Sequence, residues 1–146
     1  MAVRHHLVER PPEAVWAVLA DGSRYDRWVV GTSETREKTP GWPATGSAIE
    51  YQVRLGPYRA SGRTVVRVSE PRRRLELEAH AGALGTARIA IELRPWGEDE
   101  TLVVLDEHPL RGAGGLLHNT LDDALLQLRH RSMLARLARL VERSPR

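Results

Sequence analysis

Glu107 is the residue of this sequence best placed for acid–base chemistry. It lies near the end of a strand-like run from Thr101 to His108. Because successive side chains of a strand point to opposite faces, a register that turns Val103 and Leu105 inward also turns Glu107 inward. A carboxyl group enclosed by apolar residues can act as a general acid or base. The alternative is a Glu107 in water or paired with an arginine, because both faces of this run begin with apolar residues.

Histidines are the next candidates for proton transfer. His80 and His108 lie near the ends of predicted strands, where each is a candidate pocket base, and a solvated position is the alternative. His5 and His6 are neighbours on a predicted strand and therefore point to opposite faces. They cannot bind one ion together.

No metal or cofactor site is predicted. His118 and Asp122 share a face of a predicted helix, but no third ligand lies near them in the sequence. The chain has no cysteine, which excludes thiolate nucleophiles, disulfides and cysteine-ligated zinc. The glycine-rich run 112–115 lacks the lysine of a phosphate-binding loop, and we interpret it as a lid over a cavity mouth.

The elements that must position these residues follow from hydrophobic periodicity. A first strand over 2–8 ends at two prolines, which begin a short helix that runs to Ala20. Asp21 or Ser23 can cap a second short helix over 24–28. From Gly31 the period changes to two, and strands are predicted at 32–39, 47–55, 58–69, 73–80, 86–94 and 101–108.

The alternation of polar and apolar residues in these strands indicates an antiparallel sheet with one face in water. In the strand 58–69, for example, we expect Thr64, Val66 and Val68 on one face and Arg63 and Arg67 on the other. No segment of helical length separates the strands, which argues against a doubly wound parallel fold.

A long helix is predicted over 116–143, and it carries two apolar stripes. The first stripe is continued by the small residues Ser132 and Ala135 and consists of Leu117, Leu121, Ala124, Leu125 and Leu128. The second consists of Met133, Leu137, Leu140 and Val141. We expect the first stripe to pack on the sheet. The second contacts the first strand or the short helices, with a homodimer through this helix as the alternative. Trp42 and Trp96 lie in predicted loops, where exposed positions are expected.

Length and charge narrow the function classes. The 146 residues fit a single domain over 1–146. No apolar run approaches the length of a membrane span, and the N-terminus has no signal-peptide core, so we expect a cytoplasmic protein. The net charge is only +3, and the basic residues, of which Lys38 is the one lysine, alternate with glutamate. This pattern is typical of a solvated surface and does not favour nucleic acid as a partner.

The sequence resembles the START-like, polyketide cyclase/dehydrase superfamily. The most specific resemblance is the segment 10–21, RPPEAVWAVLAD, followed by Tyr25-Asp26-Arg27-Trp28. Weaker matches are Gly46 before a strand, the turn and strand over 69–75, and Thr101-x-Val103. The order of the predicted elements agrees, and the resemblance covers nearly the whole chain.

The resemblance implies an α+β helix-grip fold of the birch-pollen-allergen type. In such a fold a seven-stranded curved antiparallel sheet wraps around a long C-terminal helix, with two short helices after the first strand. It also implies a cavity between sheet and helix for an apolar or aromatic ligand. Because the superfamily contains lipid carriers, hormone receptors, aromatase/cyclases and co-chaperones, the fold alone does not settle the function.

We therefore predict a protein that binds a hydrophobic or aromatic small molecule, as a carrier, sensor or biosynthesis accessory. The predicted ligand-binding residues are Trp28, Tyr51, Val53, Val66, Leu77, Ile89, Ile91, Leu105, Glu107, Leu117 and Leu121. One alternative is a polyketide cyclase or dehydratase that uses Glu107 with His80 or His108. The outward position predicted for Arg63 and Arg67 weakens it, because a cavity arginine would polarise a carbonyl. Another alternative is a stress or partner-binding protein with a filled cavity.

Overall fold

The computed structural model describes residues 2–29, 32–37, 40–55, 58–80, 86–111 and 120–143. For residues 2, 37, 54, 55, 58, 60, 108–111 and 120–130 it describes the backbone alone.

The described strands form one antiparallel sheet in the order β1-β7-β6-β5-β4-β3-β2. Their bounds are β1 Ala2–Val8, β2 Thr32–Glu37, β3 Ala48–Leu55, β4 Tyr58–Glu70, β5 Arg74–His80, β6 Thr86–Trp96 and β7 Glu100–Arg111. The predicted alternation is confirmed in β3, where Ile49, Tyr51 and Val53 are buried while Gln52 is exposed. The loop predicted at 95–99 is shorter, because the β6–β7 pairing extends to Trp96.

One strand departs from simple alternation. The register between β4 and β5 shifts between Val66 and Val68, so that Val66 is buried opposite Leu77, whereas Val68 is opposite Glu76 and only half-buried. The prediction that Val68 shares the core face with Thr64 is therefore wrong. A bulge inserts one residue and reverses the facing of those beyond it.

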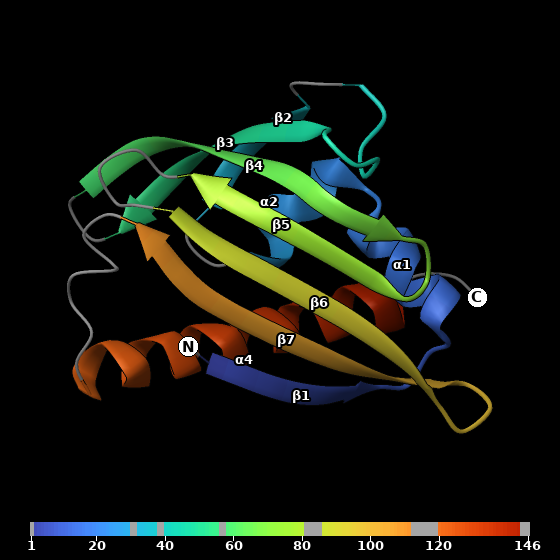
Figure 1. Ribbon diagram of the computed structural model, residues 1–146. Coiled ribbons are helices and arrows are strands. Elements are labelled where there is room, and N and C mark those ends of the chain that lie inside the picture. Colours follow the sequence, from blue (N-terminus) through green and yellow to red (C-terminus); the bar gives the residue numbers. More distant parts are fainter. Residues whose placement is uncertain are drawn as a thin grey trace.

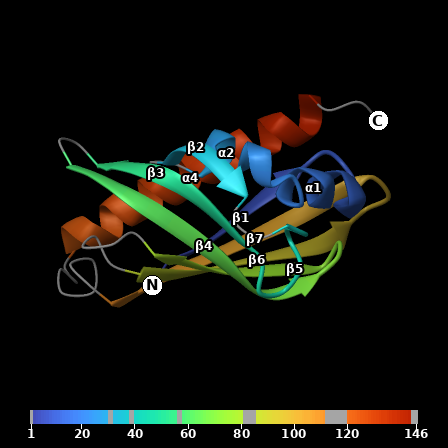
Figure 2. The ribbon, with the colours of Figure 1, turned by 90° about the horizontal axis from the view of Figure 1, so that it is seen from above.

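The helices are α1 Pro12–Leu19, a 3-10 turn Gly22–Arg24, α2 Tyr25–Trp28 and α4 Thr120–Arg143. Asp21 caps the 3-10 turn by accepting a hydrogen bond from the Ser23 backbone N–H at 3.1 Å. Figures 1 and 2 show α4 crossing the concave side of the curved sheet, with α1 and α2 on the same side. None of the described helices is long and apolar enough to cross a membrane.

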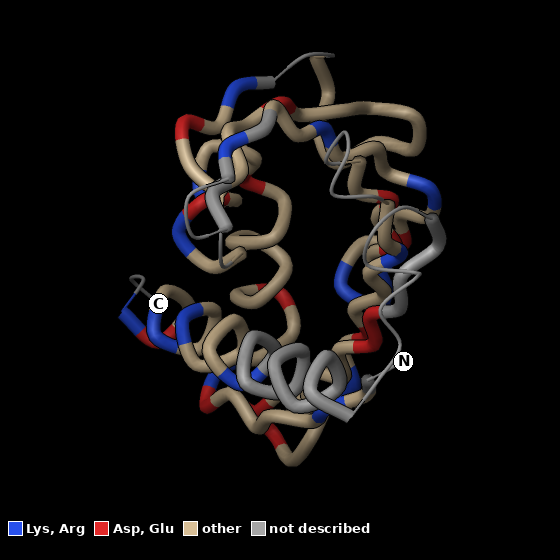
Figure 3. Tube along the Cα trace, turned by 90° about the vertical axis from the view of Figure 1, so that its left-hand side faces the viewer, with Lys and Arg blue, Asp and Glu red and all other residues tan. Residues whose placement is uncertain are grey.

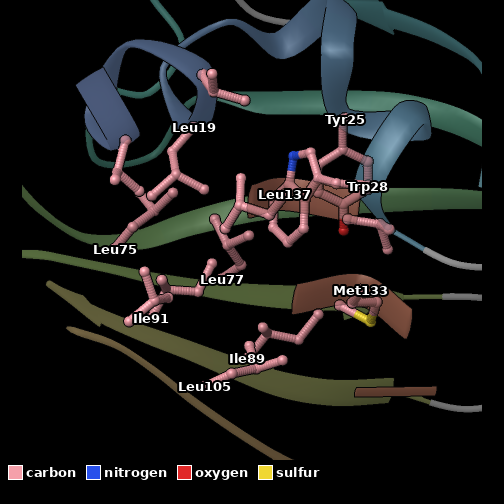
Figure 4. Close-up of a cluster of buried hydrophobic side chains, with 14 of the residues drawn as sticks. Leu19, Tyr25, Trp28, Leu75, Leu77, Ile89, Ile91, Leu105, Met133 and Leu137 are labelled. Carbon is pink, nitrogen blue, oxygen red and sulfur yellow. The ribbon is translucent and has the colours of Figure 1, made fainter. Parts of the chain in front are cut away.

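The core lies between the sheet and the C-terminal half of α4. Figure 4 shows Met133 and Leu137 of α4 facing Leu77, Ile89 and Leu105 of the sheet. Along this half of α4 the buried residues are Met133, Leu134, Leu137, Ala138 and Val141, whereas Ser132 and Ala135 are half-buried. The second predicted stripe is thus buried at Met133, Leu137 and Val141 and half-buried at Leu140, and α4 contacts β1, α1, α2 and β7. This stripe offers no support for a dimer through the helix. The side chains of the first stripe, Leu117 to Leu128, lie outside the described part of the structure, and their packing on the sheet stays a prediction.

Trp42 is a second correction, because it is buried rather than exposed. Its side chain is only 8% exposed, and its Nε1 donates a hydrogen bond to the Leu19 carbonyl oxygen at 3.2 Å. The ring also packs edge-on against Tyr25, with 6.3 Å between ring centroids. The loop after β2 therefore fastens α1 and α2 to the sheet. Trp96, by contrast, is 54% exposed, as predicted.

Candidate functional site

Glu107 lies on the concave face of the sheet, in the register with Val103 and Leu105 inward. Its side chain is 4% exposed, against 0% for Val103 and 1% for Leu105. The residue opposite it on β6 is the buried Ile89. A carboxylate is rarely enclosed in this way unless it has polar or charged partners. Glu107 is not isolated in this environment, since it makes a hydrogen bond, an ion pair or another electrostatic interaction with a neighbouring group.

The inner face of β1 adds two basic side chains to this region. Arg4 and His6 are half-buried and alternate with the exposed Val3 and Leu7. Arg4 is opposite Leu105 on β7, one diagonal step from the buried glutamate. Neither residue was predicted as part of a site, because Val3 and Leu7, the apolar side chains that mark β1 as a strand, face outward.

A cluster of hydroxyl groups lies on β3, β4 and α2. The Thr64 Oγ1 is 2.9 Å from the Tyr25 Oη and 2.6 Å from the Tyr51 Oη, and all three side chains are buried. Tyr25 and Tyr51 also make further interactions, so the cluster is well satisfied as well as buried. Of these three residues only Tyr51 was predicted to bind a ligand, because nothing in the spacing brings a residue of α2 against β4.

Gly62 explains how the Tyr51 ring reaches Thr64. A Cβ at Gly62 would collide with Tyr51 Cε2, so the ring lies directly over the backbone of β4. Tyr25 stacks on the ring at 5.2 Å between centroids and an interplanar angle of 29°. Trp28 in turn packs edge-on against Tyr25 at 5.7 Å. These contacts hold the hydroxyl cluster in one place.

Burial is complete in the middle of the concave face. Several residues predicted as cavity walls are 0–1% exposed, namely Val66, Leu77, Ile89, Ile91 and Leu105. A hollow that could hold a water molecule would leave accessible surface on its walls, so these side chains pack against one another. Trp28, at 2%, belongs to the same packed core. These six residues belong to the packed interior, and their role as ligand-binding residues stays a prediction.

Burial declines along the strands toward the end where β7 finishes and α4 begins. On β3 the exposed fraction rises from 0% at Ile49 to 4% at Tyr51 and 8% at Val53. Figure 1 shows that this end of the sheet lies beside the first turns of α4.

Two alanines occupy the concave face at this end of the central strands. Ala79 of β5 and Ala87 of β6 are directly opposite each other, and both are half-buried. Ala79 is also opposite Thr64 of the hydroxyl cluster, and Ala87 is two residues before Ile89, which is opposite Glu107. Small side chains thus lie between the two polar groups of the concave face. We call this region, Ala79 and Ala87 with Thr64, Tyr51 and Glu107 around them, the alanine platform.

The remaining predicted residues are placed as follows. His80 lies on the outer face, where its Nε2 is 3.5 Å from Glu78 Oε1 and its side chain is 40% exposed, so it is not part of the interior. His108 lies on β7, but its side chain is outside the described part of the structure, as is that of Leu121. Leu117 is outside the described residues altogether.

The outer face of the sheet is covered by ion pairs. Arg67 Nε is 2.7 Å from Glu78 Oε2, and the hydrogen bond from Arg67 lowers the pKa of Glu78. Arg63 is opposite Glu50 and exposed, like Arg67, as predicted. Neither arginine faces the interior. Figure 3 shows basic and acidic residues interspersed along the chain.

A groove of about 750 Å³ lies at the opposite end of the molecule from the alanine platform. It is bordered by the start of α1, the β4–β5 turn and the end of β6, and it carries four arginines and four glutamates. Charges of both signs balance there, so the groove does not select an anion or a cation. Among the described residues no cluster of histidine or carboxylate side chains could hold a metal ion.

The architecture described above is a helix-grip fold, a curved antiparallel sheet closed by a C-terminal helix. The polyketide cyclase/dehydrase and lipid transport family matches residues 2–142, and the chain belongs to that family. No curated protein matches the sequence significantly.

Solved structures resemble it at low sequence identity. The Zhui aromatase/cyclase from Streptomyces sp. R1128 has a TM-score of 0.74 at 18% identity, covering 97% of this chain and 93% of its own. Ara h 8.0201 has a TM-score of 0.74 at 7% identity, covering 98% and 97%. The protein CV1439 from Chromobacterium violaceum has a TM-score of 0.72 at 16% identity, covering 98% of both chains. At these identities the likeness supports the fold.

Proposed function

We propose that this chain binds an apolar or aromatic small molecule against the alanine platform, between the sheet and the N-terminal half of α4. The observation that carries the proposal is the pair Ala79 and Ala87. Alanine has the smallest side chain after glycine, and these two alanines lie opposite each other on the concave face of central strands. They are half-buried, whereas their neighbours Leu77 and Ile89 are fully buried.

Two polar groups border the platform and suit a ligand with a polar substituent. Oxygen atoms of the hydroxyl cluster and the carboxyl group of Glu107 can each accept a hydrogen bond from a ligand hydroxyl. Apolar burial would supply most of the affinity, at roughly 25 cal/mol per Å² before the cost of ordering the ligand. A planar ligand with oxygen atoms at both ends is the class that this arrangement favours.

The proposal is tested by filling the platform. Ala87→Leu adds volume on the concave face, and Ala90→Leu adds the same volume on the outer face, where Ala90 is opposite Glu76 and Asp106. Titration of both variants with 1-anilinonaphthalene-8-sulfonate, followed by fluorescence, is expected to reveal tight binding by the wild type and Ala90→Leu. Binding by Ala87→Leu should be at least tenfold weaker. Equal binding by the two variants, or no binding of any hydrophobic probe to the wild type, would contradict the proposal.

A second candidate function is a cyclase or dehydratase type of enzyme. Glu107 favours it, since a carboxyl group on the concave face beside a bound carbonyl compound could transfer a proton. Among similar structures, an aromatase/cyclase and a di-domain ARO/CYC, BexL from the BE-7585A biosynthetic pathway, also point this way. The outward position of Arg63 and Arg67 counts against it, and Arg4 is the arginine that faces the concave side among the described residues of β1. An enzyme would lose turnover in Glu107→Gln while still binding the probe, whereas a carrier would show no turnover in either form.

A third candidate is a stress or partner-binding protein with a filled interior. The observation that favours it is the complete burial of Val66, Leu77 and Ile89 on the concave face. Native mass spectrometry of the purified protein separates this candidate from the first. A copurifying small molecule supports the ligand carrier, and a bare chain that also rejects every hydrophobic probe supports a filled interior.

A further inference from the structure

The two edges of the sheet are built differently. At one edge, β2 carries a register shift between Ser33 and Arg36 and a left-handed backbone at Glu34, with φ 52°. Glu34 and Arg36 are also exposed. Bulges and charges of this kind prevent an edge strand from pairing with another chain.

The opposite edge, β1, has no register shift and no outward-facing arginine, lysine or carboxylate among its described residues, and its one arginine, Arg4, faces the concave side with Leu105. All seven residues of Ala2–Val8 pair with β7 in one unbroken register, and they include neither proline nor lysine. Val3 and Leu7 are 46% and 41% exposed, and the exposed residue between them is His5. Figure 1 shows β1 at the lower margin of the sheet with no strand beside its free edge.

The apolar character continues onto the next strand. On the outer face, Leu7 is opposite Leu102 and His5 is opposite Val104. Leu102 and Val104 are half-buried. An open strand edge beside an apolar strip is a template for the addition of another strand.

We propose that a second copy of this chain adds its own β1 to this edge, antiparallel, with the two-fold axis passing beside His5. In an antiparallel pair, two directly opposite residues point to the same face of the sheet. The two-fold axis must therefore pass between one residue and its own copy, and it cannot pass between two consecutive residues. At His5 it sets Val3 opposite Leu7 of the partner subunit on the outer face.

Charge selects this register over its neighbours. An axis at Arg4 would oppose two guanidinium groups, which is unfavourable across strands. An axis at His6 would set Val3 opposite Glu9 of the partner subunit. The axis at His5 sets no arginine opposite another arginine and joins the apolar residues. The two sheets then continue as one, in an isologous dimer that does not involve the ligand site.

The absence of cysteine makes this register directly testable. Single variants Val3→Cys, His5→Cys and Leu7→Cys are oxidised separately at pH 8 with oxidised glutathione. In the proposed dimer the two introduced thiols at position 5 lie on Cα atoms about 5 Å apart, within disulfide reach. Those at position 3, or at position 7, are separated by about 14 Å along and across the strands.

We expect a covalent dimer in high yield from His5→Cys and at least tenfold less from each of the other two alone. An equimolar mixture of Val3→Cys and Leu7→Cys should restore it. Equal yields at all three positions, or none at position 5, would overturn the proposal.

Sedimentation gives an independent readout without cysteine. One pair of seven-residue strands buries less surface than a standard interface, so we expect the wild type to pass from monomer to dimer between about 1 and 100 μM. The double variant Val3→Lys with Leu7→Lys should remain monomeric throughout. The matched control Trp96→Lys, at an exposed position off the edge, should behave as the wild type does. A wild type that stays monomeric, or a double variant that still dimerises, would contradict the proposal.

Discussion

At the scale of single residues, Gly62 determines the position of Tyr51. Any Cβ at position 62 would collide with the Tyr51 ring and with Val53 Cγ2, which would be 2.8 Å away. Neither neighbour can retreat easily, because Tyr25 stacks on the other side of the ring. The absence of a side chain on β4 is therefore what allows three hydroxyl groups to meet.

Gly62→Ala is expected to lower the free energy of unfolding by about 1–3 kcal/mol, the usual cost of overpacking a buried site. Urea denaturation followed by circular dichroism measures the loss. In a Tyr51→Leu background the same substitution should cost less, because part of the colliding ring is gone. An identical cost in both backgrounds would mean that the ring is not the source of the strain.

A second prediction is that the hydrogen bonds of the hydroxyl cluster contribute non-additively to the free energy of unfolding. Tyr25→Phe and Tyr51→Phe each remove one hydrogen bond to Thr64 Oγ1, for about 1 kcal/mol of stability apiece. Because both bonds share one oxygen, the double variant should differ from the sum of the single variants by at least 0.5 kcal/mol, roughly the threshold for coupled neighbours. Strict additivity in denaturation experiments would argue against a shared hydroxyl network.

At the scale of elements, the C-terminal half of α4 is the principal clamp on the sheet. Met133, Leu137 and Val141 are 0–1% exposed and pack against the sheet and the short helices. Arg10 fastens the end of the helix, since its Nη2 donates to the Glu142 carbonyl oxygen at 2.7 Å. This half of the helix forms the sealed part of the interior.

Leu137→Ala should therefore destabilise the fold by about 2–5 kcal/mol, the range for large-to-small changes in a packed core. Arg139→Ala, at an exposed position of the same helix, should change stability by less than about 0.5 kcal/mol. Thermal denaturation of both variants checks the contrast. Similar melting temperatures for the two would mean that this half of α4 is not docked on the sheet.

The outer ion pairs make an acid-dependent contribution to stability. Because the hydrogen bond from Arg67 lowers the pKa of Glu78 below its ordinary value near 4.5, the contribution is complete above that value. It is lost as the pH falls through the lower, folded-state pKa. The Arg67→Gln variant should be slightly less stable than the wild type at pH 7. Its free energy of unfolding should fall by less than that of the wild type between pH 5 and pH 3. The effect is small, because Arg67 is 44% exposed and water screens the pair. Denaturant midpoints across that pH range test the difference.

The limits of prediction also lie at the scale of elements. The order of strands and helices follows from the change of hydrophobic period at Gly31. Strand parity places Glu107 on the same face as Val103 and Leu105, but which face of this strand points inward stayed open, because both faces begin with apolar residues. The bulge that turns Val68 away depends on pairing with β5, which a single strand does not encode. The facing of β1 could not be predicted either, since two of its apolar residues, Val3 and Leu7, point to solvent.

At the scale of the whole molecule, the interior divides into two parts. Toward α1 it is a packed core in which Leu77, Ile89 and Leu105 contact one another and α4. Toward the end where β7 finishes, the concave face carries Ala79 and Ala87 instead. The sequence does not separate these two parts, because a leucine in a packed core and a leucine beside a cavity occur in the same alternating pattern.

The central claim is that a ligand binds against Ala79 and Ala87, and methyl NMR tests it most directly. In protein labelled with ¹³C at alanine methyl groups, addition of 1-anilinonaphthalene-8-sulfonate is expected to shift the signals of Ala79 and Ala87. The signals of Ala138 in the packed core and of Ala90 on the outer face should not move. Shifts confined to Ala90 or Ala138, with Ala79 and Ala87 unchanged at saturation, would contradict the account.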